Sequence, residues 1–440
     1  QEMVLCCRVR AANRGRVPCY AWFKAPAARG DTYEFSEGLK TRAEDGRLFA
    51  ACRLDGRPAP QDELAVLVHP GETAVFEFFL PHCPMDAARG PSMLDWDFHA
   101  IEGAVRQYWS DRLGTAATLA IPEKPVRDQV RSGLLHCDIA AVGEQPGESV
   151  AATIGWYAPI GTESAPIIQF FDSVGWHRLA ERCLDFFIDR QKENGFIQNF
   201  GGYQSETGPW LWSMGEHWRY TRDEEWLRRV TPAVRKACDC LLAWRERNKT
   251  DACREAGCYG LVDGKVADPE DYFHQFYLNA GSYQGLARAA EMLRHTDADF
   301  ATALTAEVPR YREDIRRAFY RALGRSPAVP TPDGSWAPHP PPWTEGRGAP
   351  HFYAEGGAAF THCAFASRTS LVGPMWLPFC EVLDPDERGS DVLLKTNQSP
   401  TTRDNAALSQ PYYCRHGHLH LVRGEIPAFL RTYYNQLTAL

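Results

Sequence analysis

The sequence predicts a mainly α-helical chain in which an antiparallel β-sandwich precedes an array of paired helices. Residues 1–90 contain short apolar runs separated by clusters of Gly, Pro, Asn and Asp, with turn signals about every 10–15 residues. From residue 122 onward the apolar residues instead recur at helical spacing, in segments that follow one another in pairs. No strict sequence repeat and no low-complexity tract interrupts this pattern.

The change of pattern divides the chain into three parts. We expect a β-sandwich domain over residues 1–97, a linker helix within 98–121 and a helical domain over 122–440. The first strand opens in mid-pattern and the last helical pattern runs to Leu440. We therefore expect that further strands precede this sequence and that a final helix follows it.

Composition narrows the class of partner. The 440 residues carry a net charge of −8 without any block of Lys or Arg, which makes nucleic acid and anionic membrane poor partners. No apolar run reaches the roughly 18 residues that a transmembrane helix needs. The 14 cysteines form no paired C-x-x-C pattern, so we expect reduced thiols and a cytoplasmic location. The oligomeric state is left open.

The predicted helices are long, and Pro, Asn and Gly residues mark some of their ends. Apolar spacing predicts about eleven helices, and Pro122 and Asn194-Gly195 mark a start and a stop. A Pro- and Gly-rich stretch over 325–365 predicts a long loop. The principal segments are 98–113, the stretch after Pro122, 179–190, 224–249, 272–295, 298–324, 367–383, 412–425 and 427–440.

Two loops that each end in an acidic residue lead into helices, and aromatic residues flank both. Glu163 precedes Pro166 and an apolar run, and Glu206 precedes Pro209 and another, which is a helix-start signature. Aromatic rings stack on the C–H faces of sugars, and carboxylates bind sugar hydroxyls. The alternative is that both carboxylates only complement the helix dipole, worth roughly 0.3–1 kcal/mol each.

Further acidic residues lie in two later loops. Asp268, Glu270 and Asp271 precede aromatic residues, where a carboxylic acid with a raised pKa could protonate a glycosidic oxygen. The same residues around Pro269 are also an ordinary helix N-terminus. Glu355, in His-Phe-Tyr-Ala-Glu-Gly-Gly, is a second carboxylate candidate or a simple loop acid.

The run from Tyr413 to His420 combines a tyrosine, an arginine and three histidines. Histidines at i and i+2 point to different helix faces, and no set of Asp, Glu or Cys completes a tetrahedral site, so we expect no metal. Polar contacts to a substrate from Tyr413, Arg415 or His416 are the preferred interpretation. No P-loop, G-x-G-x-x-G or G-x-S-x-G motif is present, and no cofactor is expected.

Two turn motifs carry a resemblance to a known family. Arg190–Ile197 resembles the "RQ-x-x-(D/N)G-x-I" turn of six-hairpin (α/α)6-barrel glycosidases, the superfamily of glucoamylase, trehalase and the processing glucosidases. The hairpin that ends in Tyr-Thr-Arg-Asp at Asp223 is similar to the next one in that barrel. The resemblance covers residues ~98–440 and implies an (α/α)6 toroid behind the β-sandwich.

The resemblance also implies a mechanism. These enzymes invert the anomeric centre with a general acid and a general base, and the acid lies in the loop between the fifth and sixth helices. That loop corresponds here to Tyr259–Asp271, so the role falls to Asp268 or Asp271. The base of glucoamylase-like members would lie past Leu440, or Glu355 takes its place.

The sequence therefore predicts an inverting glycoside hydrolase acting on an oligosaccharide or polysaccharide. One alternative is a polysaccharide lyase with Tyr413 and His416 as base and acid and with Arg415 on a uronate carboxylate; another is a non-catalytic carbohydrate-binding toroid. We expect Glu163 and Glu206 at the same mouth of the toroid as Asp268. The catalytic candidates are Asp268, Asp271, Glu270 and Glu355. The substrate-binding candidates are Trp156, Tyr157, Glu163, Tyr203, Glu206, Trp210, His274, Trp343, Tyr413, Arg415 and His416.

Overall fold

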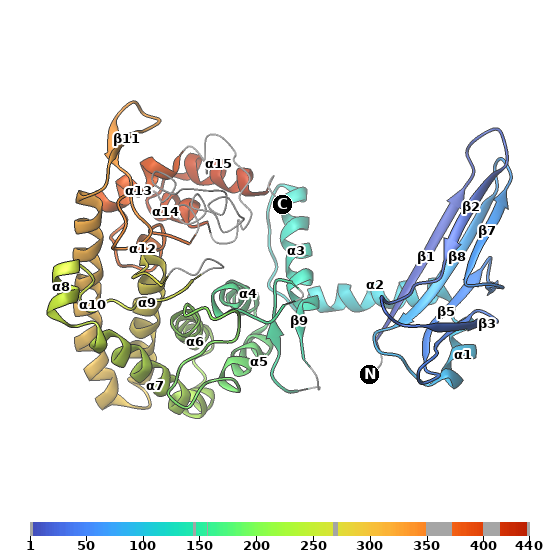
Figure 1. Cartoon of the computed structure of the whole chain (residues 1–440), viewed down its shortest axis with the longest axis horizontal. Coiled ribbons are helices and arrows are strands. Elements are labelled where there is room, and N and C mark those ends of the chain that lie inside the picture. The colour runs from blue at the N-terminus through green and yellow to red at the C-terminus, as the bar shows by residue number, and fades with distance from the viewer. Residues whose placement is uncertain are drawn as a thin grey trace. The chain divides into compact units, whose positions relative to one another are not determined.

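The computed structural model describes residues 3–143, 147–155, 157–266, 272–348, 372–398 and 414–437. The chain divides into two compact units, Gln1–Arg112 and Leu113–Leu440. Figure 1 shows strands in the first unit and mainly helices in the second. The predicted fold class, a helical-hairpin unit preceded by antiparallel β-structure, is confirmed.

The described strands of the first unit form two antiparallel sheets. The larger has the order β1-β8-β5-β4-β3 with β6 paired to β5, and the smaller joins β2 and β7. Phe23 of β2 and Phe76 of β8 stack with ring centroids 5.0 Å apart, so the sheets share one core. The bounds are β1 Val4–Ala12, β2 Cys19–Lys24, β3 Tyr33–Ser36, β4 Leu39–Arg42, β5 Leu48–Leu54, β6 Arg57–Pro58, β7 Glu63–Val68 and β8 Thr73–Pro81.

Two helices, α1 (Gly90–Leu94) and the start of α2 (Phe98–Gly114), pack beside a second small core of the larger sheet. Phe98 and Ile101 contact this core, and Arg53 of β5 donates to the Leu94 carbonyl at 2.9 Å. The predicted helix over 98–113 is therefore present. Most of its length belongs to the first unit, whereas the sequence suggested a boundary at residue 97.

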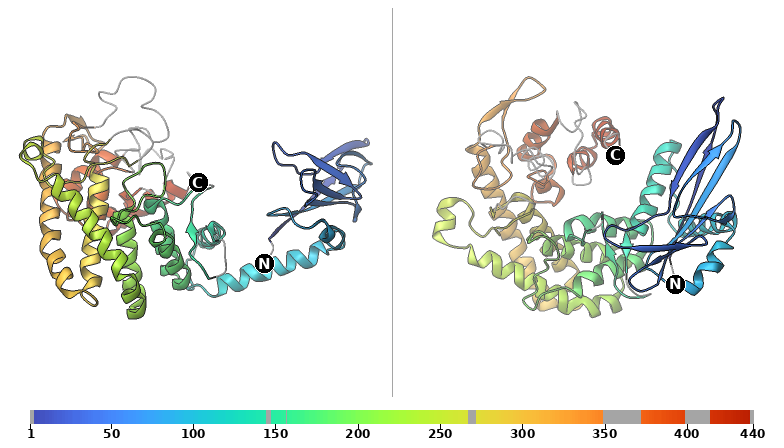
Figure 2. Two further views of the ribbon diagram at one scale, coloured as in Figure 1. Left: turned by 60° about the horizontal axis from the view of Figure 1, so that its bottom comes forward. Right: turned by 45° about the vertical axis from the view of Figure 1, so that its right-hand side comes forward.

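In the second unit, largely buried inner helices alternate with outer helices that expose one side. Successive inner helices are neighbours in the order α4, α6, α9, α12 and α14, and each outer helix packs on at least one inner helix next to it in sequence (Figures 1 and 2). The inner helices are α4 Gly161–Ser173, α6 Thr207–Thr221, α9 Phe276–Leu293, α12 Trp376–Phe379 and α14 His416–Val422. The outer helices are α3 Lys124–Ile139, α5 His177–Ile188, α7 Glu224–Arg247, α10 Ala298–Gly324, α13 Arg388–Gln398 and α15 Ile426–Leu437.

Glycines allow the inner helices to approach closely. A Cβ on Gly208 of α6 would lie 2.7 Å from Ser282 Cα in α9, and one on Gly215 would lie 2.4 Å from Arg288 Cβ. These contacts advance in the same direction along both helices, so α6 and α9 run parallel. A Cβ on Gly161 at the start of α4 would similarly lie 2.9 Å from the Glu206 carbonyl oxygen at the start of α6. The N-terminal ends of α4, α6 and α9 therefore lie at one end of the unit.

Most predicted helix bounds agree closely with the structure. Helix α10 has the predicted ends, and α7 begins at the predicted Glu224, where the Asp223 side chain accepts from two backbone N–H groups. The segment predicted as helix over 367–383 contains, in its described part, only the short α12. The short helix α8 (Asp251–Ala256) and α13 were not predicted. Short antiparallel ribbons join β9 (Ala141–Val142) to β10 (Ala151–Ala152) and β11 (Ala328–Pro330) to β12 (Trp336–Pro338).

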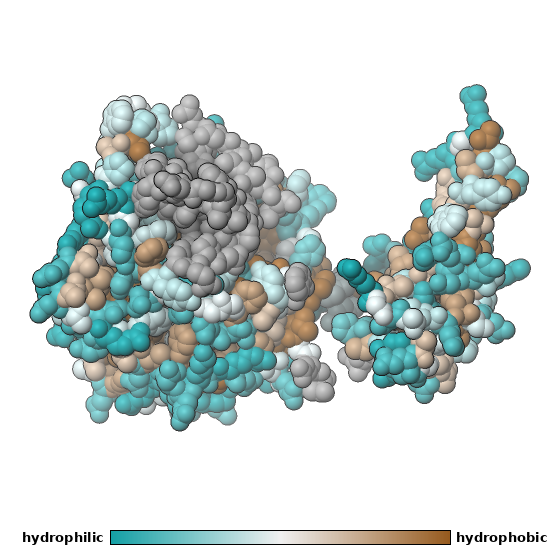
Figure 3. All heavy atoms as spheres, in the orientation of Figure 1, coloured by the Kyte–Doolittle hydropathy of each residue, from teal (hydrophilic) through white to brown (hydrophobic). Residues whose placement is uncertain are grey.

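The surface of both units is mainly hydrophilic on the face drawn in Figure 3, with apolar residues in scattered spots. Among the described helices, none combines the length and the apolar character needed to cross a membrane. The thirteen cysteines within the described ranges are all free thiols.

Candidate functional site

The end of the helical unit where α4, α6 and α9 begin is the candidate site, and we call it the mouth. It is formed by the segments that lead from each outer helix into the next inner helix. We call these segments mouth loops one to four, with residues 140–160, 189–206, 248–275 and 325–348. Loops one and three contain undescribed residues, and undescribed residues follow loop four.

Glu206, the N-cap residue of α6, is fully buried and holds two mouth loops together. One carboxylate oxygen accepts from the backbone N–H of Asn199 at 2.7 Å and of Phe200 at 3.1 Å, and the other accepts from Gly161 at 3.2 Å. Burial raises the pKa of Glu206 to about 7, although these backbone hydrogen bonds act to lower it and the nearby Glu163 acts to raise it. The helix-start prediction for Glu206 is confirmed, and its oxygens are occupied by backbone donors.

Glu163 lies in the first turn of α4 and is also buried, with 5% of its surface exposed. The Tyr157 hydroxyl donates to its Oε2 at 3.1 Å. The rings of Tyr157, Phe200 and Tyr203 form one cluster with centroid distances of 5.2 and 5.6 Å, and Lys265 Nζ lies 5.8 Å from the Tyr203 ring. The structure thus brings aromatic rings, a carboxylate and a cation together at the mouth.

Each mouth loop is bonded to the next. Loop one meets loop two where the Asn199 side chain donates to the Pro159 carbonyl, beside the bond from Gly161 at the start of α4 to Glu206. Loop two meets loop three where Gln204 N–H donates to the Lys265 carbonyl at 2.8 Å, and Lys265 N–H returns a bond to Gln204 Oε1 at 2.5 Å. Loop three meets loop four in a backbone bridge between Gln275 and Trp343.

The centre of the arc of inner helices is almost filled. A cavity of about 10 Å³ lies between them, lined by Thr162 of α4, Trp212 of α6 and residues of α9 and α12. Arg415, the N-cap residue of α14, also lines it, with its guanidinium 4.6 Å from the Trp376 ring and 4.4 Å from the Phe379 ring. Among the described residues of this run, Arg415 therefore lines the central cavity.

Two predicted aromatic residues lie inside the protein. Trp210 is 1% exposed, and its Nε1 donates to the Leu184 carbonyl of α5 at 3.3 Å, so its ring belongs to the core between helices. Trp343 is 5% exposed and stacks on Phe273, with ring centroids 4.7 Å apart. Neither side chain presents an open ring face at the mouth, because neighbouring helices and loops cover both.

Two histidines also have local partners. His274 Nδ1 lies 2.5 Å from Glu345 Oε1, which fixes loop three to loop four. His416 is fully buried, with its Nε2 3.1 Å from His420 Nε2, and burial lowers its pKa to about 3. A neutral, covered imidazole gives no support to His416 as the acid of a lyase. Within the described residues no group of three His, Cys, Asp or Glu side chains could hold a metal ion.

Six candidates fall outside the described residues: Trp156, Asp268, Glu270, Asp271, Glu355 and Tyr413. Glu163 and Glu206 do lie at one mouth, and Lys265, shortly before Asp268, is bonded to the loop that ends in Glu206. The position of Asp268 itself stays a prediction.

Comparison with solved structures identifies the fold. A bacterial glucoamylase complexed with acarbose superposes with a TM-score of 0.53 at 11% sequence identity, over 82% of this chain and 58% of that chain. The helical unit has the six-hairpin glycosidase fold. The chain thus spans 58% of the length of that six-hairpin enzyme.

Other matches to six-hairpin proteins are weaker. A rhamnosidase of glycoside hydrolase family 78 from Bacillus sp. GL1 has a TM-score of 0.48 at 11% identity, covering 100% of this chain and 41% of that chain. A rhamnosidase from Klebsiella oxytoca with rhamnose bound has a TM-score of 0.46 at 12% identity, covering 98% of this chain and 75% of that chain. No protein-family model and no curated protein matches the sequence.

Sequence reasoning missed several mouth residues of this six-hairpin unit. Phe200 and Lys265 belong to the ring cluster, and Glu345 pairs with His274. The glycines after Phe200 signalled a loop in which an aromatic side chain can lie against its neighbours. Lys265 and Glu345 carried no comparable signal, because their partners come from other loops.

Proposed function

We propose that this chain acts as an inverting glycoside hydrolase on an oligosaccharide or polysaccharide, with the mouth as its catalytic end. The observation that supports this most is the six-hairpin fold shared with a glucoamylase, together with rings and carboxylates gathered where the inner helices begin. A sugar ring needs an aromatic face and polar groups side by side, and Tyr157 with Glu163 offers both.

In this proposal the acid comes from mouth loop three. Asp268 and Asp271 lie between Lys265, which is tied to mouth loop two, and α9, which begins at the mouth. The proposal relies on the like charges of three acidic residues in so short a segment, which disfavour ionisation of any one of them. A carboxyl group kept protonated near neutral pH can donate to the leaving oxygen.

The base is proposed to be Glu355 or a carboxylate outside this sequence. Inversion requires an acid and a base roughly 6.5–9.5 Å apart, with a water molecule on the far side of the sugar. Glu206 does not fit the role, because both its oxygens accept from backbone groups and none of its surface is exposed.

The test compares Asp268→Asn and Asp271→Asn with the wild type on a panel of oligosaccharides. Release of reducing ends is measured, and the anomer first formed is read by NMR. Loss of the acid should lower turnover by about 10²–10⁴-fold with the melting temperature preserved. Asp251→Asn, an exposed carboxylate in the first turn of α8, is the control and should retain full turnover.

Two results would contradict this assignment. If both amide variants keep wild-type turnover, the acid is not in this segment, and Glu355 becomes the next candidate. If the wild type binds oligosaccharides but hydrolyses none of them, the chain is a carbohydrate-binding toroid.

A further inference from the structure

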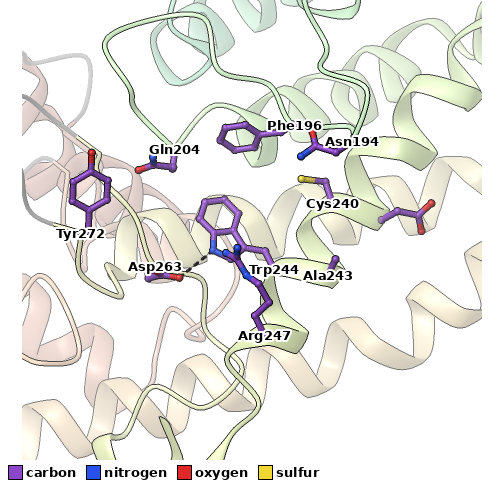
Figure 4. A pocket seen from close by; sticks show the side chains of 10 residues that line it. Asn194, Phe196, Gln204, Cys240, Ala243, Trp244, Arg247, Asp263 and Tyr272 are labelled. Carbon is purple, nitrogen blue, oxygen red and sulfur yellow. Dashed lines mark hydrogen bonds between the residues drawn. The ribbon is translucent and has the colours of Figure 1, made fainter. Parts of the chain in front are cut away.

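A second cavity lies apart from the centre of the inner helices. It has a volume of about 680 Å³, within the range of about 300–1,000 Å³ typical of small-molecule sites. Its walls come from outer helix α7 and from mouth loops two and three (Figure 4). It shares no lining residue with the narrow cavity at the centre of the arc.

Aromatic rings form the apolar part of this cavity. Phe196 and Trp244 meet edge to face, with centroids 5.8 Å apart and an interplanar angle of 78°. Tyr272, which is 54% exposed, lines the cavity as well. Figure 4 shows Phe196 and Gln204 above Trp244, with Tyr272 to one side. Rings from three separate segments thus surround one space.

Polar atoms in the same walls retain unused hydrogen-bonding capacity. Asn194 Oδ1 accepts from Phe196 N–H and Gln204 Oε1 accepts from Lys265 N–H, but in the described part of the chain nothing accepts from either side-chain NH2 group. The Arg247 guanidinium lies 5.7 Å from the Trp244 ring and has no ion-pair partner among the described residues. Within the described residues, these donors therefore line the cavity without protein acceptors.

An acceptor is present too. Asp263 Oδ1 accepts from Trp244 Nε1 at 3.0 Å and from Asn248 Nδ2 at 3.0 Å, so the carboxylate is held in place. Although burial acts to raise it, hydrogen bonds from Asn248 and Trp244 hold the pKa of Asp263 below its usual value. An ionised carboxylate beside amide donors and aromatic rings matches the hydroxyls and C–H faces of a sugar.

We infer that this cavity is an accessory carbohydrate-binding site that holds part of a long substrate beside the mouth. The inference rests on the proposed function for its sugar chemistry. A nucleotide phosphate fits poorly, because Arg247 is the one cationic side chain among the described lining residues, and two carboxylates, Asp239 and Asp263, line the cavity as well. An acyl chain would offer no acceptor to the amide and guanidinium donors. Mouth loops two and three line this cavity and also form part of the mouth, so an oligosaccharide bound in the cavity can extend toward the mouth.

Cys240 provides a direct readout, because its thiol lines the cavity. Burial raises its pKa, so alkylation by iodoacetamide is followed at about pH 9, where more thiolate is present. Peptide mass spectrometry resolves each cysteine, and the exposed Cys83 of the first unit is the internal reference. The probes are maltoheptaose and a panel of other neutral oligosaccharides.

A bound oligosaccharide should slow alkylation of Cys240 by about tenfold at about ten times its Kd, and leave Cys83 unchanged. Arg247→Ala and Tyr272→Ala should abolish this protection, since both side chains line the cavity. Arg247→Ala, which alters only outer helix α7, should leave hydrolysis of a disaccharide unchanged. Arg228→Ala, an exposed arginine on the same helix paired with Glu224, is the matched control and should keep the protection.

The outcomes separate this inference from the proposed function. Hydrolysis without protection of Cys240 by any panel sugar would overturn the accessory site and leave the hydrolase proposal standing. Protection of Cys240 without hydrolysis of any panel sugar would overturn the hydrolase proposal and leave the binding site standing. Protection that survives both Arg247→Ala and Tyr272→Ala would place the sugar elsewhere and would also overturn the inference.

Discussion

Replacing Glu206 by glutamine should change how the stability of the helical unit depends on pH. The pKa of Glu206 rises from 4.5 to about 7 in the folded protein, chiefly because the carboxyl group is buried. The folded state therefore holds this proton more tightly than the unfolded state does. Its stabilising effect is complete below pH 4.5 and is lost as the pH rises through 7.

The magnitude follows from the size of the shift. Each pKa unit corresponds to about 1.4 kcal/mol, so the whole effect is about 3 kcal/mol. About 2.5 kcal/mol of it falls between pH 5 and pH 8. Glu206→Gln removes the titration, but its amide NH2 would face the Gly161 N–H, which costs about 1–3 kcal/mol at every pH.

Urea unfolding followed by tryptophan fluorescence tests this, since most tryptophans lie in the helical unit. The unfolding free energy of the wild type minus that of Glu206→Gln should fall by about 2.5 kcal/mol from pH 5 to pH 8. Glu224→Gln, which alters an exposed carboxylate at the start of α7, should track the wild type. A constant difference between wild type and Glu206→Gln across this range would refute the reasoning.

Two further predictions concern the packing of inner helices. Gly215→Ala should lower the unfolding free energy by about 1–3 kcal/mol, because the new Cβ would lie 2.4 Å from Arg288 Cβ, whereas Gly103→Ala in α2, with open space around it, should not destabilise. Burial lowers the pKa of His416 to about 3, so the neutral imidazole stabilises the folded state and this contribution is lost as the pH falls below 6.5. His416→Phe removes this titration and should therefore lose less stability than the wild type on acidification. Thermal unfolding at pH 7 and pH 5 checks the second, and the wild type should lose about 2 kcal/mol more than the variant.

The sequence was sufficient for the long helices because their signals are local. Apolar spacing fixes the buried face of α7 and α10, and Asp223 and Asp297 cap their first turns. The start of α6 at Glu206 was predictable for the same reason. Its contacts with Asn199, Phe200 and Gly161 were not, because they depend on how two loops meet in space.

The candidate site was harder to predict, because an aromatic residue has the same sequence signature in a core and in a cleft. Tyr157 and Tyr203 lie at the mouth as expected, but Trp210 and Trp343 are covered by neighbouring elements. The cavity beside α7 was missed because Trp244 reads as one more apolar residue of a helical stripe. The other walls of this cavity come from mouth loops two and three, which are distant from each other in sequence.

The bonds that join each mouth loop to the next limit how specificity can be redesigned. A loop two taken from another six-hairpin protein would need an acceptor for the Gly161 N–H where Glu206 lies, and an acceptor for the Lys265 N–H where Gln204 lies. Replacing mouth loop two alone breaks both junctions. Exchanging loops one to four together preserves them and keeps the pair of His274 and Glu345 between loops three and four. Chimaeras that transfer the contiguous block should fold, whereas single-loop grafts should lose the fixed arrangement of rings around Tyr203.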